Sequence, residues 1–390
     1  MGKIDELIQQ YCPEGVEYVP IGDYLSYEQP TRYLVESTKY DDSYTTPVLT
    51  AGQSFILGYT KETSGIFDAS RNNPVIIFDD FTTSFHWVEF SFKVKSSAMK
   101  MLRPTNESKA LFRYLYHCMK NVQYVPGDHT RQWIGTYSQF EIPLPPLPVQ
   151  EAIVNILDRF AVYAAELQAE LQARQQQYNY YRDTLLSFEG REDVQWKKLG
   201  EVCAKTDNIK WKTTTGTYQY IDLSSVDIQT HSILSTTPID KSSAPSRAQQ
   251  IVRENDVIFA TTRPTQMRVC IVPSKYDGEI CSTGFCVLRP NKEIVLPQYL
   301  FFALAVDDFR AYLSNNLTQG NYPSISNNTL KEYLLPIPSI EEQQHIVDIL
   351  DRFDTLVNDL SQGLPAEIEA RQQQYEYYRD QLLTFKRKEA

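Results

Sequence analysis

Two stretches of the chain place apolar or bulky residues at alternating spacings of four and three, the pattern of a helical heptad seam. The first stretch is 148–190, and no Gly or Pro interrupts it from Val149 to Glu189, so we expect one long helix there. Pro148 and Glu151 suit its first turn, and Gly190 suits its end. Its seam positions are Ile153, Leu157, Phe160, Ala164, Leu167, Leu171, Arg174, Tyr178, Tyr181 and Leu185.

The second stretch, 339–390, repeats this seam but holds four extra residues in its middle. Four residues are about one helical turn, so the seam stays on one face. The insertion contains Gly363 and Pro365, however, and Pro365 would clash with the carbonyl of Ser361, which predicts a kink or break near 361–365. Its seam positions are Ile346, Leu350, Phe353, Val357, Leu360, Arg371, Tyr375, Tyr378 and Leu382.

Two helices of one chain that share a seam most simply pair with each other as an antiparallel coiled coil. A structural spacer or a dimerisation coil would show the same heptads, so both alternatives stay open at this point. The remaining residues form two bodies, 1–147 and 191–338, with short apolar runs between clusters of turn-forming residues. The clearest expected strands are 74–78 and 256–260, and the clearest expected short helices are 108–119 and 296–306. The predicted fold class is therefore α+β, with two such domains in tandem and each followed by a long helix.

The sequence is a tandem duplication of one module. Residues 173–186 recur as 370–383 with twelve of fourteen positions identical, at an offset of 197. Residues 156–160 recur unchanged as 349–353 at an offset of 193, and fainter matches at offsets of 186 and 178 continue backwards through both bodies. Each copy joins a variable body to a nearly unchanged helix, which implies differing ligands and one shared spacing role. Antiparallel helices would relate the bodies by a pseudo-two-fold axis, a symmetry that suits duplex DNA.

The charge of the chain is divided unevenly between the bodies and the helices. The net charge is −11, from 38 basic and 49 acidic residues, whereas nucleic-acid binders are usually basic. Residues 1–145 carry −4 and residues 191–338 carry +1, while the two helical parts carry −3 and −5 in only 97 residues. The acidity therefore does not exclude DNA, but we expect weak DNA binding unless a partner supplies further contacts.

Composition and short motifs exclude several classes of protein. With 390 residues, 42% hydrophobic and 22% charged, the chain is typical of a globular protein with two domains and an additional part. Its longest apolar run has seven residues where a membrane span needs about 20, and the N-terminus lacks an apolar signal core. The six cysteines form no CxxC pair and the five histidines no i,i+4 pair. We therefore expect free thiols, no metal site and a cytoplasmic location.

Motifs for catalysis or cofactor binding are missing from the sequence. It contains no GxGxxG or GxxxxGK(S/T) cradle for a nucleotide, no HExxH and no GxSxG. It also lacks the Asn/Asp-Pro-Pro-aromatic tetrapeptide with which adenine methyltransferases hold a flipped base. We therefore expect no catalytic residues and no cofactor in this chain. An enzyme with an unrecognised site is a third hypothesis, which methyl transfer or DNA cleavage by the chain alone would support.

Loops at corresponding places of the two bodies carry residue types that contact bases and phosphates. Arg pairs bidentately with guanine and Gln with adenine, while hydroxyl and aromatic side chains add further contacts. The expected DNA-binding residues are Thr82, Thr83, Ser84, Arg131 and Gln132 in the first body and Arg263, Gln266, Arg268, Asn321, Tyr322 and Ser324 in the second. Ordinary solvated turns use the same residue types. Because the loops occur at corresponding places in both copies, DNA binding and ordinary turn formation are equally supported as explanations.

With two variable bodies and two near-identical helices, the chain resembles the DNA-specificity subunit of type I restriction-modification enzymes. The resemblance covers nearly the whole chain, and its most specific motifs are the Pro-rich entries into the two helices. These motifs are LPPLPVQ at 144–150 with 153–160, and PIPSIEEQ at 336–343 with 346–353. Residues 282–285 and 289–290 are similar to segments of the family's target recognition domains.

The resemblance implies that each body is a target recognition domain for one half of a split, asymmetric DNA site, and that the paired helices fix the gap between the halves. It implies as partners, besides double-stranded DNA, two methyltransferase subunits that carry S-adenosylmethionine and restriction subunits that use ATP and Mg²⁺. The chain itself would be non-catalytic, without metal and not bound to a membrane. The alternative from another class is a scaffold or adaptor that presents two domains on a coiled coil and binds proteins.

Overall fold

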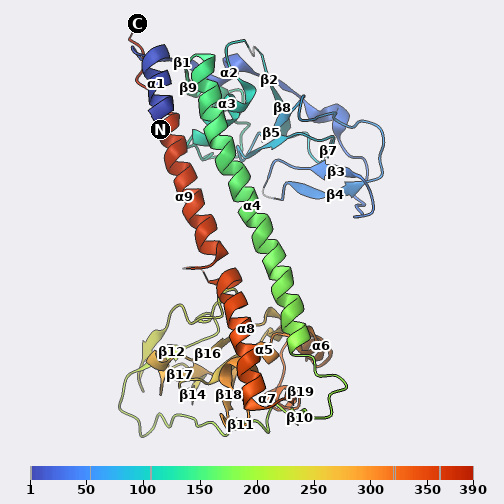
Figure 1. Cartoon of the computed structure of the whole chain (residues 1–390), viewed down its shortest axis with the longest axis vertical. Coiled ribbons are helices and arrows are strands. Elements are labelled where there is room, and N and C mark those ends of the chain that lie inside the picture. The colour runs from blue at the N-terminus through green and yellow to red at the C-terminus, as the bar shows by residue number, and fades with distance from the viewer. Residues whose placement is uncertain are drawn as a thin grey trace. The chain divides into compact units, whose positions relative to one another are not determined.

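The computed structural model divides the chain into two compact units (Figure 1). The first unit joins Met1–Ala165 to Arg371–Ala390, and the second unit is Glu166–Ala370. Each unit therefore contains one body together with segments of both helical stretches. The residues that the structure describes are 2–52, 54–105, 108–318, 320, 322–359 and 362–389. Among these residues, no helix combines the length and the apolar character that crossing a membrane requires.

In the first unit, three small sheets surround the apolar core of the body. Their strand orders are β1-β9, β2-β8-β5-β6 and β4-β3-β7, with all pairs antiparallel except β3 with β7. The strands are β1 (Glu17–Pro20), β2 (Leu25–Glu28), β3 (Thr46–Leu49), β4 (Ile56–Thr60), β5 (Val75–Asp79), β6 (Phe85–Val88), β7 (Lys93–Val94), β8 (Met99–Pro104) and β9 (Glu141–Leu144). The helices before the long one are α1 (Gly2–Tyr11), α2 (Ile21–Tyr24) and α3 (Phe112–Asn121), with 3-10 turns η1 (Pro30–Tyr33) and η2 (Tyr137–Gln139).

The second unit repeats this arrangement strand for strand and adds β14. Its sheets have the orders β10-β19, β11-β18-β15-β16 and β13-β12-β17-β14, again with one parallel pair, β12 with β17. The strands are β10 (Gln195–Lys198), β11 (Cys203–Ala204), β12 (Tyr218–Ile221), β13 (Thr237–Ile239), β14 (Ala248–Ile251), β15 (Val257–Ala260), β16 (Val269–Ile271), β17 (Ile280–Ser282), β18 (Phe285–Pro290) and β19 (Leu334–Ile337). The short helices are α5 (Pro297–Ala303), α6 (Asp307–Asn315) and α7 (Asn327–Lys331), with 3-10 turns η3 (Pro264–Gln266) and η4 (Ser274–Tyr276).

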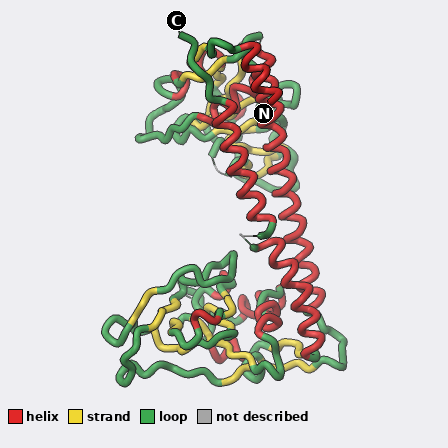
Figure 2. Tube along the Cα trace, turned by 60° about the vertical axis from the view of Figure 1, so that its left-hand side comes forward, coloured by secondary structure: helices red, strands yellow, loops and turns green. Residues whose placement is uncertain are grey.

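The predicted α+β class is confirmed, and loops make up much of each body (Figure 2). β5 and β15 are the continuous apolar runs that the sequence indicates, because both lie between two neighbouring strands and are buried. The short helices α3 and α5 fall within or near the expected ranges. α3 starts four residues later than expected because the chain before it is held by hydrogen bonds to the start of the long helix.

The long helix α4 (Leu147–Leu185) begins where its sequence predicts, with Pro148 in the first turn. It ends five residues before Gly190, the predicted stop, because Leu186 and Phe188 leave the helix and are buried in the core of the second unit. The second stretch is two helices, α8 (Ile340–Asn358) and α9 (Leu364–Leu382), so Pro365 marks a break and not a kink. A side chain at Gly363 would collide with the carbonyl oxygen of Thr355, 2.5 Å from the added Cβ.

Within each unit, the two helical segments run antiparallel. In the first unit the rings of Phe160 and Tyr378 stack with centroids 5.5 Å apart, and Tyr163 lies against Arg371. In the second unit Tyr181 and Phe353 stack at the same 5.5 Å, and these residues are the repeat equivalents of Tyr378 and Phe160. The buried seam residues are Ile153, Leu157, Leu167, Tyr178, Ile346, Leu350, Val357 and Leu382; Tyr181 is 39% exposed. Leu360 lies outside the described residues, and the pseudo-two-fold relation between the bodies stays a prediction.

One buried glutamine joins each helix start to its own body. Gln150 accepts a hydrogen bond from the backbone N–H of Leu111 at 2.9 Å and donates to the carbonyls of Lys109 and Pro145. Its repeat equivalent Gln343 makes the same three bonds to Leu296, Ile294 and Pro338. An amide that satisfies three otherwise unpaired backbone groups fixes the body relative to the first helical turns.

Candidate DNA interface

Five of the six residues predicted for the second body line one hollow of about 690 Å³. They are Arg263, Gln266, Arg268, Tyr322 and Ser324, joined by Leu223, Ser224, Arg247 and Thr262. The lining contains three arginines and no carboxylate, which favours an anionic ligand. The sixth predicted residue, Asn321, lies outside the described residues.

The hollow is formed where the chain leaves β15. Arg263 donates its backbone N–H to the carbonyl of Pro323 at 2.7 Å, and Thr262 forms an isolated bridge with Ser324. These bonds hold the two predicted loops together, although about 60 residues separate them in the sequence. Arg263 (φ 51°) and Met267 (φ 54°) are both left-handed, a conformation that side-chain-bearing residues rarely adopt. Such backbone is found preferentially at binding sites, where surrounding bonds maintain it.

The Arg263 side chain is exposed and stacks on a neighbouring aromatic ring. Its guanidinium carbon lies 5.0 Å from the centroid of Tyr322, which is itself 68% exposed. Among the described residues no carboxylate forms an ion pair with Arg263 or with the exposed Arg247. Stacking on an aromatic face orients the planar guanidinium while leaving its N–H groups available, which is the state required to bind a base edge bidentately.

Arg268 also holds a neighbouring loop in place. It is half-buried, and its guanidinium donates a hydrogen bond to the backbone carbonyl of Val226. That carbonyl belongs to the loop that carries Leu223 and Ser224 to the rim of the hollow. This bond makes Arg268 a brace for the loop, and because Arg268 also lines the hollow, its contact with DNA stays a prediction.

The braced loop is also ordered by Asp222. Its carboxylate accepts hydrogen bonds from Ser224 and Ser225, at 2.7 to 3.1 Å. Burial acts to raise the pKa of Asp222, but these hydrogen bonds outweigh it and hold the pKa below its ordinary value. The Asp222 carboxylate is thus ionised and engaged within the loop, which leaves Ser224 exposed at the hollow.

In the first body, Thr82, Thr83 and Ser84 form the turn between β5 and β6. Thr82 is exposed and its hydroxyl lies 2.5 Å from that of the half-buried Ser84. Thr83 is buried and left-handed (φ 58°), and its hydroxyl donates to the carbonyl of Thr82. Thr83 therefore shapes the turn, and the prediction of a DNA contact is corrected for it, whereas Thr82 and Ser84 keep hydroxyls at the surface.

The second predicted loop of the first body places Arg131 at the surface and Gln132 in the interior. Gln132 is 2% exposed, accepts a hydrogen bond from the Tyr124 hydroxyl at 2.7 Å and donates to the carbonyl of Thr130 at 2.9 Å. Its amide is fully used inside the body, so the prediction that it contacts DNA is corrected. Arg131 beside it is exposed.

Asp80 joins the two loops of the first body. Its backbone carbonyl accepts from the N–H of Gln132 and its carboxylate from the N–H of Trp133, both at 2.8 Å. Lys100 lies 3.2 Å from the same carboxylate, and both charged side chains are about 1% exposed. A buried, paired and hydrogen-bonded carboxylate is a specific structural anchor. The loops that carry Thr82 and Arg131 are thus brought together, as their counterparts are in the second body.

Sequence reasoning missed Arg247 and Ser224. Arg247 follows a run typical of a solvated turn, and no periodicity or motif distinguishes it from other surface arginines. Its place at the hollow comes from pairing, because its carbonyl accepts from the N–H of Thr283 in the turn between β17 and β18. The Ser-Thr-Gly-Phe motif at 282–285 was therefore the available signal, since it forms the neighbouring turn.

Metal-ligand clusters and reactive thiols are two kinds of reactive group that the described titratable side chains of the bodies could form. In the described part of the chain, no three His, Cys, Asp or Glu side chains gather as metal ligands would. The cysteines are free, and burial raises the pKa of Cys118 and Cys270 to about 12, far from the range of a reactive thiolate. The arrangement can bind a polyanion through arginines and hydroxyls.

Comparisons with known proteins give consistent results. Residues 13–174 and 191–370 match the family model described as the type I restriction modification DNA specificity domain. The specificity subunit of the type I restriction enzyme EcoR124I/EcoR124II of Escherichia coli is 40% identical over 96% of this chain and 95% of its own length. The S subunit of a type I restriction-modification system from M. genitalium shares the fold at a TM-score of 0.57, with 13% identity over 95% of this chain and 96% of that one.

A further solved structure matches in part. The HsdS subunit of Thermoanaerobacter tengcongensis is 35% identical, with a TM-score of 0.42, and the alignment spans 47% of each chain.

Proposed function

Because the chain belongs to the type I restriction-modification DNA specificity family, we propose that its two bodies contact the two halves of a split, asymmetric DNA site. The chain recognises DNA sequence within a restriction-modification complex and is not itself an enzyme. The observation that carries the assignment of residues is the hollow of the second body, where Arg247, Arg263 and Tyr322 meet without a carboxylate.

In the second body, Arg263 is suited to a guanine, because its stacked guanidinium presents a rigid fork toward the O6 and N7 acceptors. Gln266 is exposed on the adjacent 3-10 turn and is suited to an adenine. Arg247, Ser224 and Ser324 are suited to phosphate oxygens, which position the duplex without reading it. In the first body, Thr82, Ser84 and Arg131 occupy the corresponding loops and would contact the other half-site.

The helices supply spacing and docking, and other subunits supply the chemistry. Two methyltransferase subunits would bind S-adenosylmethionine, and restriction subunits would bind ATP and Mg²⁺, so that no cofactor is held by this chain. This role places the chain in the cytoplasm with its DNA. The alternative of a scaffold that binds only proteins is disfavoured by the family membership, and the experiment below separates the two.

The test is to purify the chain with its methyltransferase partner, sequence the methylated motif in a host that carries both genes, and titrate the complex with the duplex found. We expect two specified half-sites around an unspecified gap. Lengthening the gap by three base pairs should abolish the gel shift, because the proposed spacer role of the helices allows one gap length. A complex that assembles but binds no duplex at low salt would support the scaffold and contradict recognition.

A further inference from the structure

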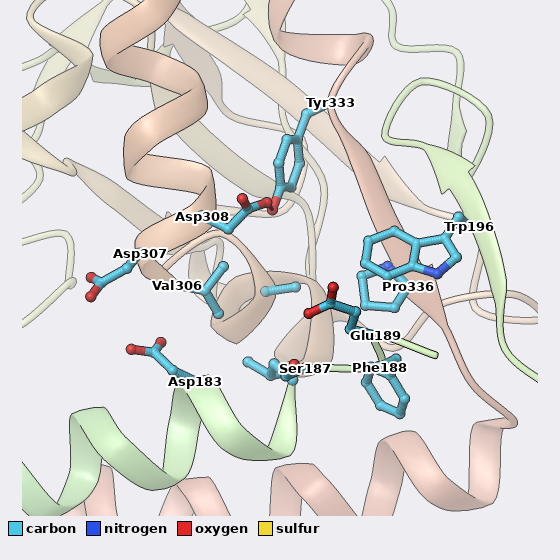
Figure 3. Close-up of a pocket in the computed structure, with 12 residues that line it drawn as sticks. Asp183, Ser187, Phe188, Glu189, Trp196, Val306, Asp307, Asp308, Tyr333 and Pro336 are labelled. Carbon is cyan, nitrogen blue, oxygen red and sulfur yellow. Dashed lines mark hydrogen bonds between the residues drawn. The ribbon is translucent and has the colours of Figure 1, made fainter. Parts of the chain in front are cut away.

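The second unit has a groove of about 630 Å³ between the end of α4, strand β10 and the start of α6 (Figure 3). Its lining includes Asp183, Glu189, Trp196, Asp307, Asp308 and Tyr333. Trp196 lies beside Pro336 and is 49% exposed, and the four carboxylates border the rest of the groove. No Lys or Arg belongs to the lining, although Arg182 pairs with Asp183 at 2.8 Å and lies 3.9 Å from Asp307. The groove is therefore acidic mainly through Glu189 and Asp308, with Asp307 only loosely paired.

The first unit has a groove of about 330 Å³ at the repeat-equivalent place. Tyr18 stands where the second unit has Trp196, and Pro143 stands where it has Pro336, at the offsets of 178 and 193 that define the duplication. Leu383 and Thr384 correspond to Leu186 and Ser187 at the offset of 197. The groove is therefore a property of the module, and both copies have kept it.

In the first unit, the C-terminal tail of the chain occupies the rim of this groove. After α9 the tail runs beside Val16. The N–H of Val16 donates to the carbonyl of Lys386, and the N–H of Lys388 donates to the carbonyl of Val16, both at 2.9 Å. The Arg387 guanidinium lies 2.6 Å from Glu141 and 4.5 Å from the centroid of the Tyr18 ring. The tail is thus an extended basic segment bound by backbone hydrogen bonds, an ion pair and a cation–π contact.

The first unit is shaped to admit this tail. Gly15 has φ +94°, and a side chain there would place its Cβ 2.4 Å from the carbonyl oxygen of Lys386. The Tyr18 hydroxyl donates to the carbonyl of Phe385 at 2.9 Å, which orients the ring that receives Arg387. The tail is therefore seated by features of the body as well as by its own charge.

In the second unit, the chain cannot follow the same path. Only five residues separate Phe188 from Val194, so the chain turns back after Phe188. In this turn the N–H of Arg191 donates to the carbonyl of Phe188, and Gly190 has a left-handed backbone with φ +76°. Among the described residues no segment bridges to Val194, in contrast to its equivalent Val16. The ring of Trp196 is left without the cation that covers Tyr18.

The two grooves differ in charge. The second groove is the more acidic, as expected if it binds a basic segment of another protein. At the offset of 197 Glu189 corresponds to Lys386, and at the offset of 186 Asp307 and Asp308 correspond to Asn121 and Val122, none of which is acidic. The copy whose rim holds a built-in basic tail lacks these carboxylates, and the copy without a tail has them. Asp308 also accepts a hydrogen bond from the hydroxyl of Tyr333 at 3.2 Å, so one of the carboxylates is held by an aromatic residue of the same groove.

We propose that the groove of the second unit binds an extended segment of a partner protein that carries Lys or Arg, seated as the C-terminal tail is seated in the first unit. The carboxylates repel phosphate, so the face selects protein and not DNA. The proposal rests on the proposed function only for the identity of the partner, a subunit of the same complex.

A peptide probe tests the groove directly on the full-length chain. The probe is a synthetic peptide with the tail sequence TFKRKE, and the control is the charge-reversed peptide TFEEEE. Calorimetric titration should show one saturable site for the basic peptide, because the tail already fills the other rim. Binding should weaken by about tenfold or more, the scale of interfacial charge changes, in Trp196→Ala and in the triple variant Glu189→Lys, Asp307→Lys, Asp308→Lys. Trp196→Phe, which keeps an aromatic ring, should retain binding. Equal binding of both peptides, or binding unchanged in these variants, would overturn the proposal.

The same triple variant tests the groove in the complex. Co-expressed with the methyltransferase partner, it should lose partner occupancy in native mass spectrometry, while Glu254→Lys, Glu293→Lys, which reverses exposed acids outside the groove, should not. Its thermal unfolding midpoint serves as the folding control. Unchanged partner occupancy in the triple variant, whatever its affinity for the duplex, would overturn the docking site. A wild-type complex that assembles but ignores the bipartite duplex contradicts the proposed function and leaves the groove proposal intact.

Discussion

Two arginines on one loop of the second body differ in what their guanidinium groups contact. Arg263 is exposed and lies over Tyr322, whereas Arg268 donates to the carbonyl of Val226. The first arrangement leaves donors available to a ligand, and the second uses them to hold a neighbouring loop in place. Identical side chains five residues apart thus make different contacts, one available to a ligand and one that positions a loop.

Substituting Arg263 with Ala should relax one position of the half-site that the second body contacts. The loss of a bidentate guanine contact corresponds to about 1–3 kcal/mol of discrimination. Arg268→Ala should instead weaken binding at every sequence, because it loosens the 222–226 loop. Methylome sequencing and duplex titration separate the two outcomes, with the exposed Lys292→Ala as a control for the loss of one charge. An unchanged methylated motif in Arg263→Ala would count against base contact.

His117, which is buried, and His231, which is half-buried, predict how stability depends on pH. Burial lowers the pKa of His117, although the hydrogen bond between its Nε2 atom and Asp158, at 2.8 Å, acts in the opposite direction. Burial also lowers the pKa of His231. Below about pH 6.5 the unfolded chain binds protons at these residues more readily than the folded chain does. The free energy of unfolding should therefore decrease as the pH falls through 6.5.

Urea denaturation at pH 7.5 and pH 5.5 measures this dependence. His117→Gln should reduce the difference between the two pH values, whereas His129→Gln, at an exposed position, should leave it unchanged. An identical pH dependence in the wild type and in His117→Gln would show that His117 is not responsible.

At the scale of elements, the long helix α4 contributes to both units. Its first half packs against α9 and its second half against α8, through the equivalent ring pairs Phe160–Tyr378 and Tyr181–Phe353. The glutamines at the helix starts, Gln150 and Gln343, connect each body to this packing by three hydrogen bonds apiece. A change in the middle of α4 should therefore affect spacing and not base contact.

Leu167→Pro should break α4 at a position where the side chain is buried. A proline in a helix interior costs about 3 kcal/mol or more, because it removes a backbone hydrogen bond and clashes with the preceding turn. The expected result is a complex that loses its partner subunits and its specific gap length together. Leu167→Ala separates the lost side chain from the broken helix, and Gln168→Ala is a surface control. Normal assembly and gap length in Leu167→Pro would contradict the spacer role.

At the scale of the whole molecule, charge determines what the chain can bind alone. The net charge is −11, and the helical parts carry −8 of it, whereas the two bodies carry −4 and +1. We expect the isolated chain to bind duplex weakly, and the complex with its methyltransferase partner to bind tightly with a steep dependence on salt. Fluorescence anisotropy between 50 and 200 mM salt, two concentrations chosen to resolve that slope, measures both. Equal affinity with and without the partner would show that this chain supplies the phosphate contacts by itself.

The sequence determined those features of the chain that depend on local periodicity. The start of α4 and the break at Gly363 and Pro365 follow from spacings of three and four residues or from residues that cannot continue a helix, and the buried strands β5 and β15 follow from continuous apolar runs. The duplication follows from matching segments at offsets of 178 to 197 residues. Most of the helical seam was predicted for the same reason, since burial recurs at every turn of a helix that packs along its length.

The tertiary structure decided which of the predicted loop residues are free to bind. Gln132, Thr83 and Arg268 have the residue types of a DNA contact but are held by Tyr124, Thr82 and Val226, and Arg247 joins the hollow through a strand turn 36 residues away. α4 also ends at Leu185 and not near Gly190, because Leu186 and Phe188 are buried in the second unit. A hydrogen bond or a buried contact depends on the partner that folding brings within reach, and for Arg268 and Arg247 that partner lies more than 30 residues away in the sequence.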